Sequence, residues 1–379
     1  MHRVLVLGGG LVGSVIARDL SKDSGIEVTV VDNNKKRIQQ IKDSSKVQDL
    51  LLDLSKEGAV SKIAQDFDLV IGAVPGFLGF KVVKEAIEAH KNVVDISFSE
   101  RDYFELDDLA KEKEVTVVFD CGVAPGMSNI LAYALAKELD ETESIKIFVG
   151  GLPQTRFWPY EYKIVFSPYD VIEEYTRPTR IVENGKIVIK EALSDVELID
   201  VEGVGTLEAF NTDGLRSLLK TLNVPNMVEK TLRFLGHAEK MKILRYTGFF
   251  GKEPVGVNGQ KIAPLDVTAK LLFPILELRE GEKDFTVMKV EAKGKKYNKK
   301  IALSYFLVDY YDEETRTTSM VRTTGFPAAI VSRMILKGEF NYKGVYPPEY
   351  IANHESLFGM LLKELEKRKV RFLKEERVL

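Results

Sequence analysis

The sequence predicts an α/β protein in which a doubly wound parallel sheet is followed by a second, mixed α/β domain with an open sheet. Short apolar strands alternate with helices over the first third of the 379 residues, and this alternation is typical of a parallel sheet that is covered on both faces. A glycine-rich turn joins the first strand to the first helix. After residue 127 the alternation is lost, and strands rich in Tyr, Thr and Phe are separated by longer loops.

The first third contains the elements of one sheet in chain order. Strands are expected at residues 4–7, 28–31, 68–74, 92–97 and 115–120. Helices are expected from the end of the glycine-rich turn to Leu20, at 80–89 and at 106–113. Each strand is a short apolar run bounded by turn residues. Ligands of such sheets lie beyond the carboxyl ends of the strands, so residues 73–75, 95–97 and 120–122 should surround one crevice.

The rest of the chain predicts a second domain and a returning tail. A helix is expected at 129–139, a strand at 144–149, another helix at 328–337 and a possible edge strand at 370–373. Apolar residues spaced by three or four predict one more helix, at 357–365. We expect a dinucleotide-binding domain at 1–125, a substrate domain at 126–325 and a segment at 326–379 that packs back on the first domain. The chain crosses between domains near residues 126 and 325, which would form a hinge.

The glycine-rich turn spans residues 8–13. In this G-x-G-x-x-G pattern Gly8 permits a tight turn, Gly10 lets a pyrophosphate approach the backbone, and Gly13 lets the helix pack closely on the strand. Asp32 ends the second strand nineteen positions after Gly13, where a carboxylate accepts hydrogen bonds from ribose hydroxyls. The pattern predicts a Rossmann-type dinucleotide site, the alternative being a glycine turn that binds nothing.

The acid at position 32 favours NAD, because its carboxylate repels the 2′-phosphate of NADP. The polar and basic run at residues 33–37 keeps NADP as the alternative cofactor, since nearby cations accommodate that phosphate.

The composition excludes several classes of protein. Hydrophobic residues make up 45% and charged residues 29% of the chain, and the net charge is −3, so neither nucleic acid nor a membrane surface is indicated as a partner. No apolar run reaches the ~18 residues that cross a bilayer. The single cysteine, Cys121, rules out an internal disulfide framework. We expect a cytoplasmic protein without a metal site, which binds a small molecule and forms a homodimer.

A second informative segment lies at residues 119–129, where a strand ends in a Gly-Pro-Gly turn that leads into a helix. Gly122 and Gly126 remove side-chain bulk, so the backbone can approach the nicotinamide end of a cofactor. Ser128 or Asn129 could cap the helix. The alternative is a tight turn at a domain boundary.

At these residues the chain resembles the saccharopine dehydrogenase-like reductases, and most of all their L-lysine 6-dehydrogenase branch. The resembling segments, in order along nearly the whole chain, are residues 8–13, 119–129, 148–153, 173–178, 207–210, 213–216, 236–240 and 345–349.

The resemblance implies an NAD-dependent dehydrogenase that removes hydride from the ε-carbon of lysine, after which water releases ammonia and leaves 2-aminoadipate 6-semialdehyde. Two alternatives stay open. One is a related enzyme that reduces an imine to, or oxidises, a saccharopine-like secondary amine. The other is a non-catalytic NAD-binding protein.

Hydride can leave only from a neutral amine, whereas the lysine ammonium has a pKa of about 10.4. The site must therefore remove a proton, by desolvation or through a base. His237 is the first candidate for the base, because imidazole titrates near neutrality. Asp95 and Asp120, both at strand ends, could hold the amine or relay its proton, or could simply cap turns or bind the cofactor.

The carboxylate of an amino-acid substrate calls for an arginine, which can donate two parallel hydrogen bonds to it. Arg216 is the first choice, with Arg177 and Arg322 as alternatives, although each could be a surface ion pair. Asn129 and Thr324 are further candidates for contact with substrate, and residues 323–325 could equally be a plain hinge.

The expected cofactor contacts combine the glycine turn with the ends of the other strands. They are Gly8, Gly10, Leu11, Val12, Gly13, Asp32, Asn33, Asp53, Ala73, Val74, Pro75, Asp95, Ile96, Cys121, Gly122 and Ala124. Cys121 is expected to be a small apolar residue behind the cofactor rather than a reactive thiolate.

Overall fold

The computed structural model describes residues 1–44 and 47–379 and divides them into two compact units. Unit 1 comprises Met1–Leu131 and Val321–Arg371, and unit 2 comprises Ala132–Met320 and Phe372–Leu379. No helix in the described part of the chain is long and apolar enough to span a bilayer. The predicted α/β class, with a parallel sheet, a second mixed sheet and a returning tail, is confirmed.

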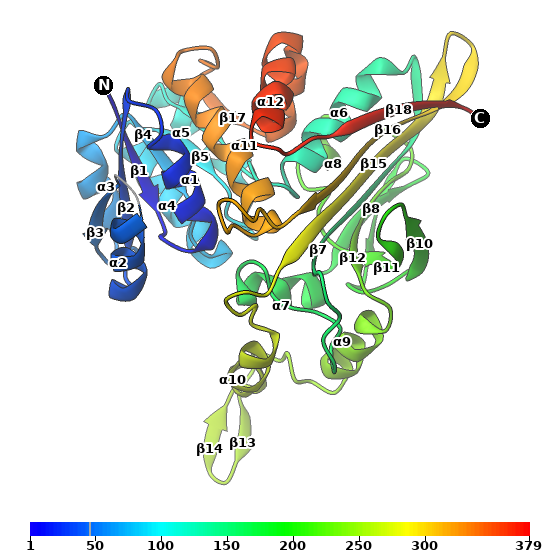
Figure 1. The fold of residues 1–379 in the computed structure, drawn as a ribbon, viewed down its shortest axis with the longest axis horizontal. Helices are drawn as coiled ribbons and strands as arrows, with labels where there is room; N and C mark the ends of the chain where they lie inside the picture. The colour runs from blue at the N-terminus through cyan, green and yellow to red at the C-terminus, as the bar shows by residue number, and fades with distance from the viewer. Residues whose placement is uncertain (45–46) are drawn as a thin grey trace. The chain divides into compact units, whose positions relative to one another are not determined.

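Unit 1 contains a parallel sheet whose N-terminal strands are drawn in blue in Figure 1. The sheet has seven strands in the order β17-β6-β5-β4-β1-β2-β3. The strands are β1 His2–Leu7, β2 Ile26–Asp32, β3 Gln48–Leu51, β4 Leu69–Gly72, β5 Asn92–Asp95, β6 Thr116–Val118 and β17 Gly344–Tyr346. From β1 the chain moves in one direction to β2 and β3, and from β4 in the other direction to β5 and β6. The order therefore reverses between β1 and β4, which is where such sheets bind their ligands.

Helices cover both faces of this sheet. They are α1 Leu11–Leu20, α2 Lys35–Ser44, α3 Ala59–Ile63, α4 Gly76–Glu88, α5 Asp107–Glu112, α11 Ser319–Leu336 and α12 Glu355–Lys367, with short 3₁₀ turns at Ala64–Asp66, Tyr103–Leu106 and Pro348–Asn353. Leu5 and Leu7 of β1 belong to one core with α3, α4 and α5. On the other face α11 packs on α1, because a Cβ at Gly325 would lie only 3.3 Å from Cγ1 of Ile16.

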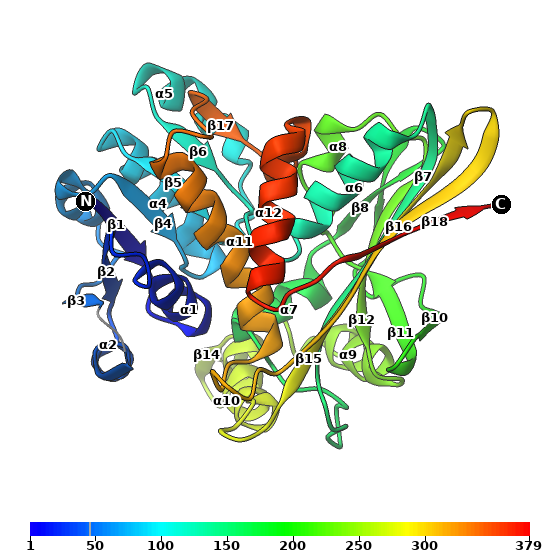
Figure 2. The ribbon, with the colours of Figure 1, turned by 45° about the horizontal axis from the view of Figure 1, so that its top comes forward.

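Unit 2 is built on a nine-stranded mixed sheet, in which β10-β11-β12-β7-β15-β16-β18 are neighbours in that order (Figure 2). Only β12 and β7 run parallel along this path. The strands are β7 Glu141–Pro153, β10 Glu197–Val201, β11 Gly205–Asn211, β12 Met227–Arg233, β15 Asp284–Lys296, β16 Lys299–Tyr310 and β18 Leu373–Val378. A hairpin of β8 Thr179–Glu183 and β9 Lys186–Lys190 adds to β12.

The helices that accompany this sheet are α6 Met127–Glu138, α7 Pro168–Thr176, α8 Leu218–Thr221, α9 His237–Tyr246 and α10 Pro264–Leu276. Beside α10 a separate small hairpin is formed by β13 Val255–Val257 and β14 Gln260–Ile262.

The structure corrects two expectations about the tail. The helix expected at 328–337 begins nine residues earlier, at Ser319, so residues 323–325 are helical and do not form a hinge loop. The cause lies far away in sequence: the Asp284 carboxylate accepts hydrogen bonds from the backbone N–H groups of Ser319 (2.7 Å) and Met320 (2.9 Å) and thereby caps the helix. The expected edge strand at 370–373 lies at Leu373–Val378 instead, paired with β16.

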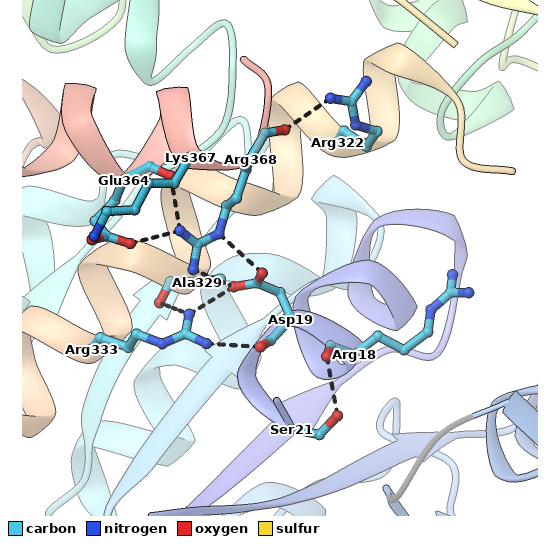
Figure 3. A network of polar contacts seen from close by, with 9 residues as sticks. All are labelled: Arg18, Asp19, Ser21, Arg322, Ala329, Arg333, Glu364, Lys367 and Arg368. Atoms are coloured by element: carbon cyan, nitrogen blue, oxygen red, sulfur yellow. Dashed lines mark hydrogen bonds and ion pairs between the residues drawn. The ribbon is translucent and has the colours of Figure 1, made fainter. Parts of the chain in front are cut away.

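A buried ion network joins α1 to the two C-terminal helices of unit 1 (Figure 3). The Asp19 carboxylate receives Nη1 of Arg333 at 2.7 Å, and Nε and Nη2 of Arg368 at 3.0 Å each. Arg368 also donates to Glu364 at 2.8 Å. Burial alone would raise the pKa of Asp19, but the hydrogen bonds and charges of Arg368 and Arg333 outweigh it and lower that pKa.

We predict that Asp19→Asn lowers the free energy of unfolding by about 3–5 kcal/mol, because the largely buried Arg333 loses its countercharge and Arg368 keeps only that of Glu364. Urea denaturation measures the effect. The control is Glu88→Gln, which breaks an exposed pair with Lys84 and should change stability by no more than about 0.5 kcal/mol. If Asp19→Asn lowers the free energy of unfolding by no more than the control does, the proposed role of the network is contradicted.

Candidate active site

The turn between β1 and α1 packs directly on the turn after β4. Gly8 has φ +109°, and a Cβ there would collide with the carbonyl oxygen of Ala73. A Cβ at Gly13 would collide with the carbonyl oxygen of Gly8. The first and third glycines of the pattern are therefore required by close approach of backbone to backbone.

The second glycine of the pattern faces open space. No atom lies within 4 Å of the Cβ position of Gly10, and Gly10 caps α1 without any side-chain hydrogen bond to the first turn. The N–H groups of that first turn point out of the helix, and the helix dipole favours negative charge there. This cradle fits the pyrophosphate of a dinucleotide.

Asp32 lies beside this cradle and already holds the turn. Its Oδ2 accepts a hydrogen bond from the N–H of Gly9 (2.8 Å), and its Oδ1 accepts one from the N–H of Asn34 (2.7 Å). Each carboxylate oxygen has a second lone pair, so two ribose hydroxyls can still donate. The exposed Arg37 places Nη1 3.7 Å from Oδ2.

The other expected cofactor contacts lie at the carboxyl ends of the same strands. Asp53 follows β3 and accepts hydrogen bonds from the N–H and hydroxyl of Ser55 (3.0 and 2.7 Å). Ala73, Val74 and Pro75 follow β4, and Ile96 follows β5, where its N–H donates to Gly72 (2.9 Å).

Asp95 ends β5 and is completely buried. Its carboxylate accepts hydrogen bonds from the N–H (3.0 Å) and hydroxyl (2.9 Å) of Ser97 and from the hydroxyl of Tyr103 (2.8 Å). Burial raises the pKa of Asp95 to about 7, against the lowering effect of these donors and with a further increase from the charge of Asp120. Asp95 can therefore hold or release a proton near neutrality.

The loop after β6 brings several expected residues together. The N–H of Cys121 donates to the carbonyl of Asp95 (2.8 Å), and burial raises the pKa of the Cys121 thiol, which is consistent with an inert side chain. Asp120 is buried and has φ +50°. Cγ2 of Thr324, from α11, lies 3.3 Å from the Cβ position of Gly122, so Thr324 joins this group.

Asn129 stabilises the same loop. Gly126 has φ +135°, and a Cβ there would collide with the backbone of Gly122. The Asn129 side-chain oxygen accepts hydrogen bonds from the N–H of Gly126 (3.1 Å) and the hydroxyl of Ser128 (2.9 Å). Because α6 begins at Met127, Ser128 and Asn129 lie inside the helix, which corrects the expectation that one of them is its N-cap residue.

His237 is the first residue of α9 in unit 2, and its side chain is completely buried. Nδ1 lies 2.7 Å from the carbonyl oxygen of Tyr160, and Nε2 lies 2.8 Å from the hydroxyl of Tyr175. Because a carbonyl can only accept, Nδ1 carries the proton and Nε2 accepts from Tyr175. Burial, followed by the charge of Arg233, lowers the pKa of His237 to about 3, so the imidazole is neutral.

Arg233 occupies the centre of this buried group and was missed by sequence reasoning. Its Nη2 lies 2.6 Å from Glu174 and 3.4 Å from the hydroxyl of Tyr162, whose ring lies 4.3 Å from the guanidinium carbon. The available signal was the pattern of β12, in which Glu229, Thr231 and Arg233 occupy alternate positions and thus one face of the strand.

Glu229, on the same strand, adds a second buried acid. It accepts hydrogen bonds from the Thr212 hydroxyl (2.6 Å) and the N–H of Gly214 (3.1 Å). Burial raises the pKa of Glu229 to about 8, so this carboxyl group is largely protonated at neutral pH.

The arginines expected to bind substrate do not all fall in one unit. Arg216 follows the Thr212–Gly214 loop in unit 2, is half-buried, and has φ +49°. Arg177 ends α7, with Nη2 3.6 Å from Glu173. Arg322 lies on α11 in unit 1, where it donates to the carbonyl of Arg368 (3.0 Å), so it belongs with the packing of α12.

Five cationic side chains of unit 2 that are at most 15% exposed each lie within 4 Å of a carboxylate. The pairs are Lys163–Glu282, Arg177–Glu173, Lys230–Glu197, Arg233–Glu174 and Arg245–Glu191. The positive charge of these groups is therefore already balanced within the protein.

Comparison with known proteins fits this geometry. The model of the saccharopine dehydrogenase NADP binding domain matches residues 4–118, and that of the saccharopine dehydrogenase C-terminal domain matches residues 122–370. The chain belongs to the saccharopine dehydrogenase family. This membership confirms the resemblance to the saccharopine dehydrogenase family found in the sequence, and residues 4–118 match a nicotinamide-dinucleotide binding domain.

The relatives of this family member differ in length and in what they act on. It is 26% identical to the mitochondrial alpha-aminoadipic semialdehyde synthase of Mus musculus over 91% of its own length, but it spans only 45% of that relative. It is 24% identical to the saccharopine dehydrogenase (NADP⁺, L-glutamate-forming) of Schizosaccharomyces pombe, and 25% identical to the carboxyaminopropylagmatine dehydrogenase of a Synechocystis species, with more than nine-tenths of each chain covered.

The solved apo structure of the L-Glu-forming saccharopine dehydrogenase from Saccharomyces cerevisiae shares the fold. It matches over the whole of both chains with a TM-score of 0.81 at 20% identity.

We predict that Asp95→Asn changes the pH dependence of stability. The pKa of Asp95 is about 7 in the folded protein, above its ordinary value of 3.8. Between these pH values the folded protein keeps a proton on Asp95 that the unfolded chain has lost. The contribution of Asp95 to the free energy of unfolding therefore falls as the pH rises from about 4 to 7. The amide of the variant does not titrate. The free energy of unfolding of Asp95→Asn should therefore rise relative to that of the wild type by about 1.4 kcal/mol for each pH unit between about 4 and 7.

Urea denaturation from pH 4 to 8 measures this difference. Ser97→Ala is the control, since it removes a donor to Asp95 but leaves the titrating group in place and should retain the wild-type slope. A difference between Asp95→Asn and wild type that stays constant with pH would rule out a buried titrating carboxyl at this position.

Proposed function

We propose that the protein catalyses the NAD-dependent oxidative deamination of the ε-amino group of L-lysine to 2-aminoadipate 6-semialdehyde and ammonia. The observation that carries the choice of lysine is the pairing of the buried cations in unit 2. A substrate with two or three carboxylates needs several uncommitted cations, whereas lysine has one carboxylate and a net positive charge.

The reaction requires that the substrate amine lose a proton before hydride leaves. In this proposal the water-excluding surroundings disfavour the ammonium form, and His237 with Tyr175 provides the base. The neutral imidazole accepts a hydrogen bond from the Tyr175 hydroxyl at Nε2, while the Tyr160 carbonyl fixes its tautomer. Asp95 and Asp120 serve as the second proton-holding group, beside the cofactor edge of unit 1. NAD, when bound, supplies the acceptor for the hydride.

Arg216 is proposed to bind the substrate carboxylate, with Arg177, whose pair with Glu173 would then have to open, as the alternative. Arg216 is half-buried and follows the loop in which the Thr212 hydroxyl and the Gly214 N–H donate to the buried Glu229. Asn129 and Thr324 are assigned to the same substrate as supporting polar groups around the loop at residues 119–129.

NAD rather than NADP is proposed because the Asp32 carboxylate lies where a 2′-phosphate would bind. The guanidinium of Arg37, 3.7 Å from that carboxylate, would have to outweigh it for NADP to bind as well. A cytoplasmic homodimer is proposed for the assembled protein, and size-exclusion chromatography with light scattering tests the dimer.

The second candidate function is the oxidation or formation of a saccharopine-like secondary amine. The names of the relatives favour it, since both family models and the fungal relatives concern saccharopine.

A substrate panel separates the two candidates. Purified protein is given NAD or NADP with lysine, saccharopine and simple diamines, and reduction of the cofactor is followed at 340 nm together with ammonia release. We expect turnover with lysine and NAD, with one ammonia per cofactor reduced. Turnover with saccharopine alone would replace the proposal by the second candidate, and no turnover with any substrate would contradict both.

We predict that His237→Ala lowers turnover by roughly 10²-fold or more and leaves the affinity for NAD unchanged, because His237 lies in unit 2 and the dinucleotide cradle lies in unit 1. Tyr175→Phe should lower turnover in the same direction, since it removes the hydroxyl held by Nε2. Steady-state kinetics and NAD titration measure both effects.

The matched control is His90→Asn, which removes an exposed imidazole at a position with φ +59° that asparagine tolerates. It should leave turnover unchanged. Wild-type turnover in a folded His237→Ala variant, as judged by its thermal melting, would eliminate His237 as the base.

A further inference from the structure

Two large apolar side chains are exposed at the carboxyl edge of the parallel sheet in unit 1. Leu11 is the first residue of α1 and is 60% exposed, and Phe77 is the second residue of α4 and is 78% exposed. Apolar residues one turn further along the same helices are buried, including Val15 of α1 and Phe80 of α4. We call Leu11 and Phe77 the apolar rim.

The two residues of the apolar rim lie on either side of the reversal in strand order. β1 and β4 pair in parallel with Leu7 opposite Gly72, and the turns that follow these strands touch at Gly8 and Ala73. The crossovers from β1 to β2 and from β4 to β5 move in opposite directions, and right-handed connections then place α1 and α4 on opposite faces of the sheet. Leu11 and Phe77 therefore stand at the starts of two helices on opposite faces of the sheet, beside the contact between Gly8 and Ala73.

The open position at Gly10 and the Asp32 carboxylate, which holds the N–H of Gly9, lie at the same edge of the sheet. A dinucleotide has a planar ring at each end of the ribose–pyrophosphate–ribose chain that these groups would hold. An aromatic side chain stacks on such a ring, and an aliphatic side chain covers its face. Polar residues at the first turns of α1 and α4 would interact better with water than these two do.

We infer that the apolar rim binds a ring of the dinucleotide, with Phe77 stacked on the base and Leu11 packed against the sugar or base from the other side. This inference rests on the proposed use of a dinucleotide. It assigns to Phe77 a binding role that the glycine pattern and Asp32 do not indicate.

Isothermal titration of the full-length protein with NAD tests the inference. Phe77→Ala should weaken NAD binding by about 10-fold, within the range of about 5–150-fold that stacking on one base contributes. Phe77→Trp should restore the affinity, and Leu11→Ala should weaken binding as well. Since both side chains are exposed, the thermal melting of the variants should match the wild type.

Titration with ADP-ribose and with nicotinamide mononucleotide then identifies the ring. A loss of affinity for ADP-ribose in Phe77→Ala places the adenine on Phe77, and a loss for the mononucleotide places the nicotinamide there. Tyr297→Asn is the control, because Tyr297 is 79% exposed on the β15–β16 hairpin and has φ +52°, and this variant should bind NAD like the wild type.

Equal NAD affinity of Phe77→Ala and the wild type would overturn the inference and leave the proposed function intact. Failure of the wild type itself to bind NAD or NADP would overturn the proposed function and, with it, the apolar rim as a binding site.

Discussion

The close contact between the β1–α1 turn and the β4–α4 turn is the constraint on which the cofactor edge of unit 1 depends. Gly8 and Gly13 have no room for a side chain, because carbonyl oxygens of Ala73 and Gly8 occupy that space. This contact lies at the strand reversal between β1 and β4 and beside the open position at Gly10, and Asp32 holds the same turn through the N–H of Gly9. A larger residue at Gly8 would separate the two turns.

The opposite end of α1 is fixed by charge. Asp19 binds Arg333 and Arg368, so the last helices of the chain complete the unit that contains the first strand.

The chemistry proposed for unit 2 depends on a different kind of burial. His237 stays neutral and shares its lone pair with Tyr175, while Arg233 is matched by Glu174. Neutral donors and balanced charges suit the removal of a proton from an amine, since an uncompensated carboxylate would stabilise the ammonium.

Local patterns were sufficient for five of the seven strands of the parallel sheet and for the glycine turn, because strand alternation and close glycine packing depend on neighbours in sequence. The two edge strands, β3 and β17, were not predicted. The predicted start of α11 was wrong, because the residue that caps this helix, Asp284, lies 35 residues away on β15. Arg233 was missed because a buried arginine on a strand is intelligible only when Glu174 and Tyr162 are seen beside it. The roles of His237, Arg216 and Asp120 stay predictions, as burial and hydrogen bonds describe their state and leave their chemistry to be measured.

The most direct test of the central proposal is the fate of hydrogen at the lysine ε-carbon. The protein is incubated with NAD and L-lysine carrying two deuterium atoms at C6, and the reduced cofactor and product are analysed by mass spectrometry. We expect one deuterium in the reduced cofactor and one retained in the semialdehyde or its cyclic form. A cofactor reduced without deuterium, or reduced only when saccharopine replaces lysine, would contradict the account.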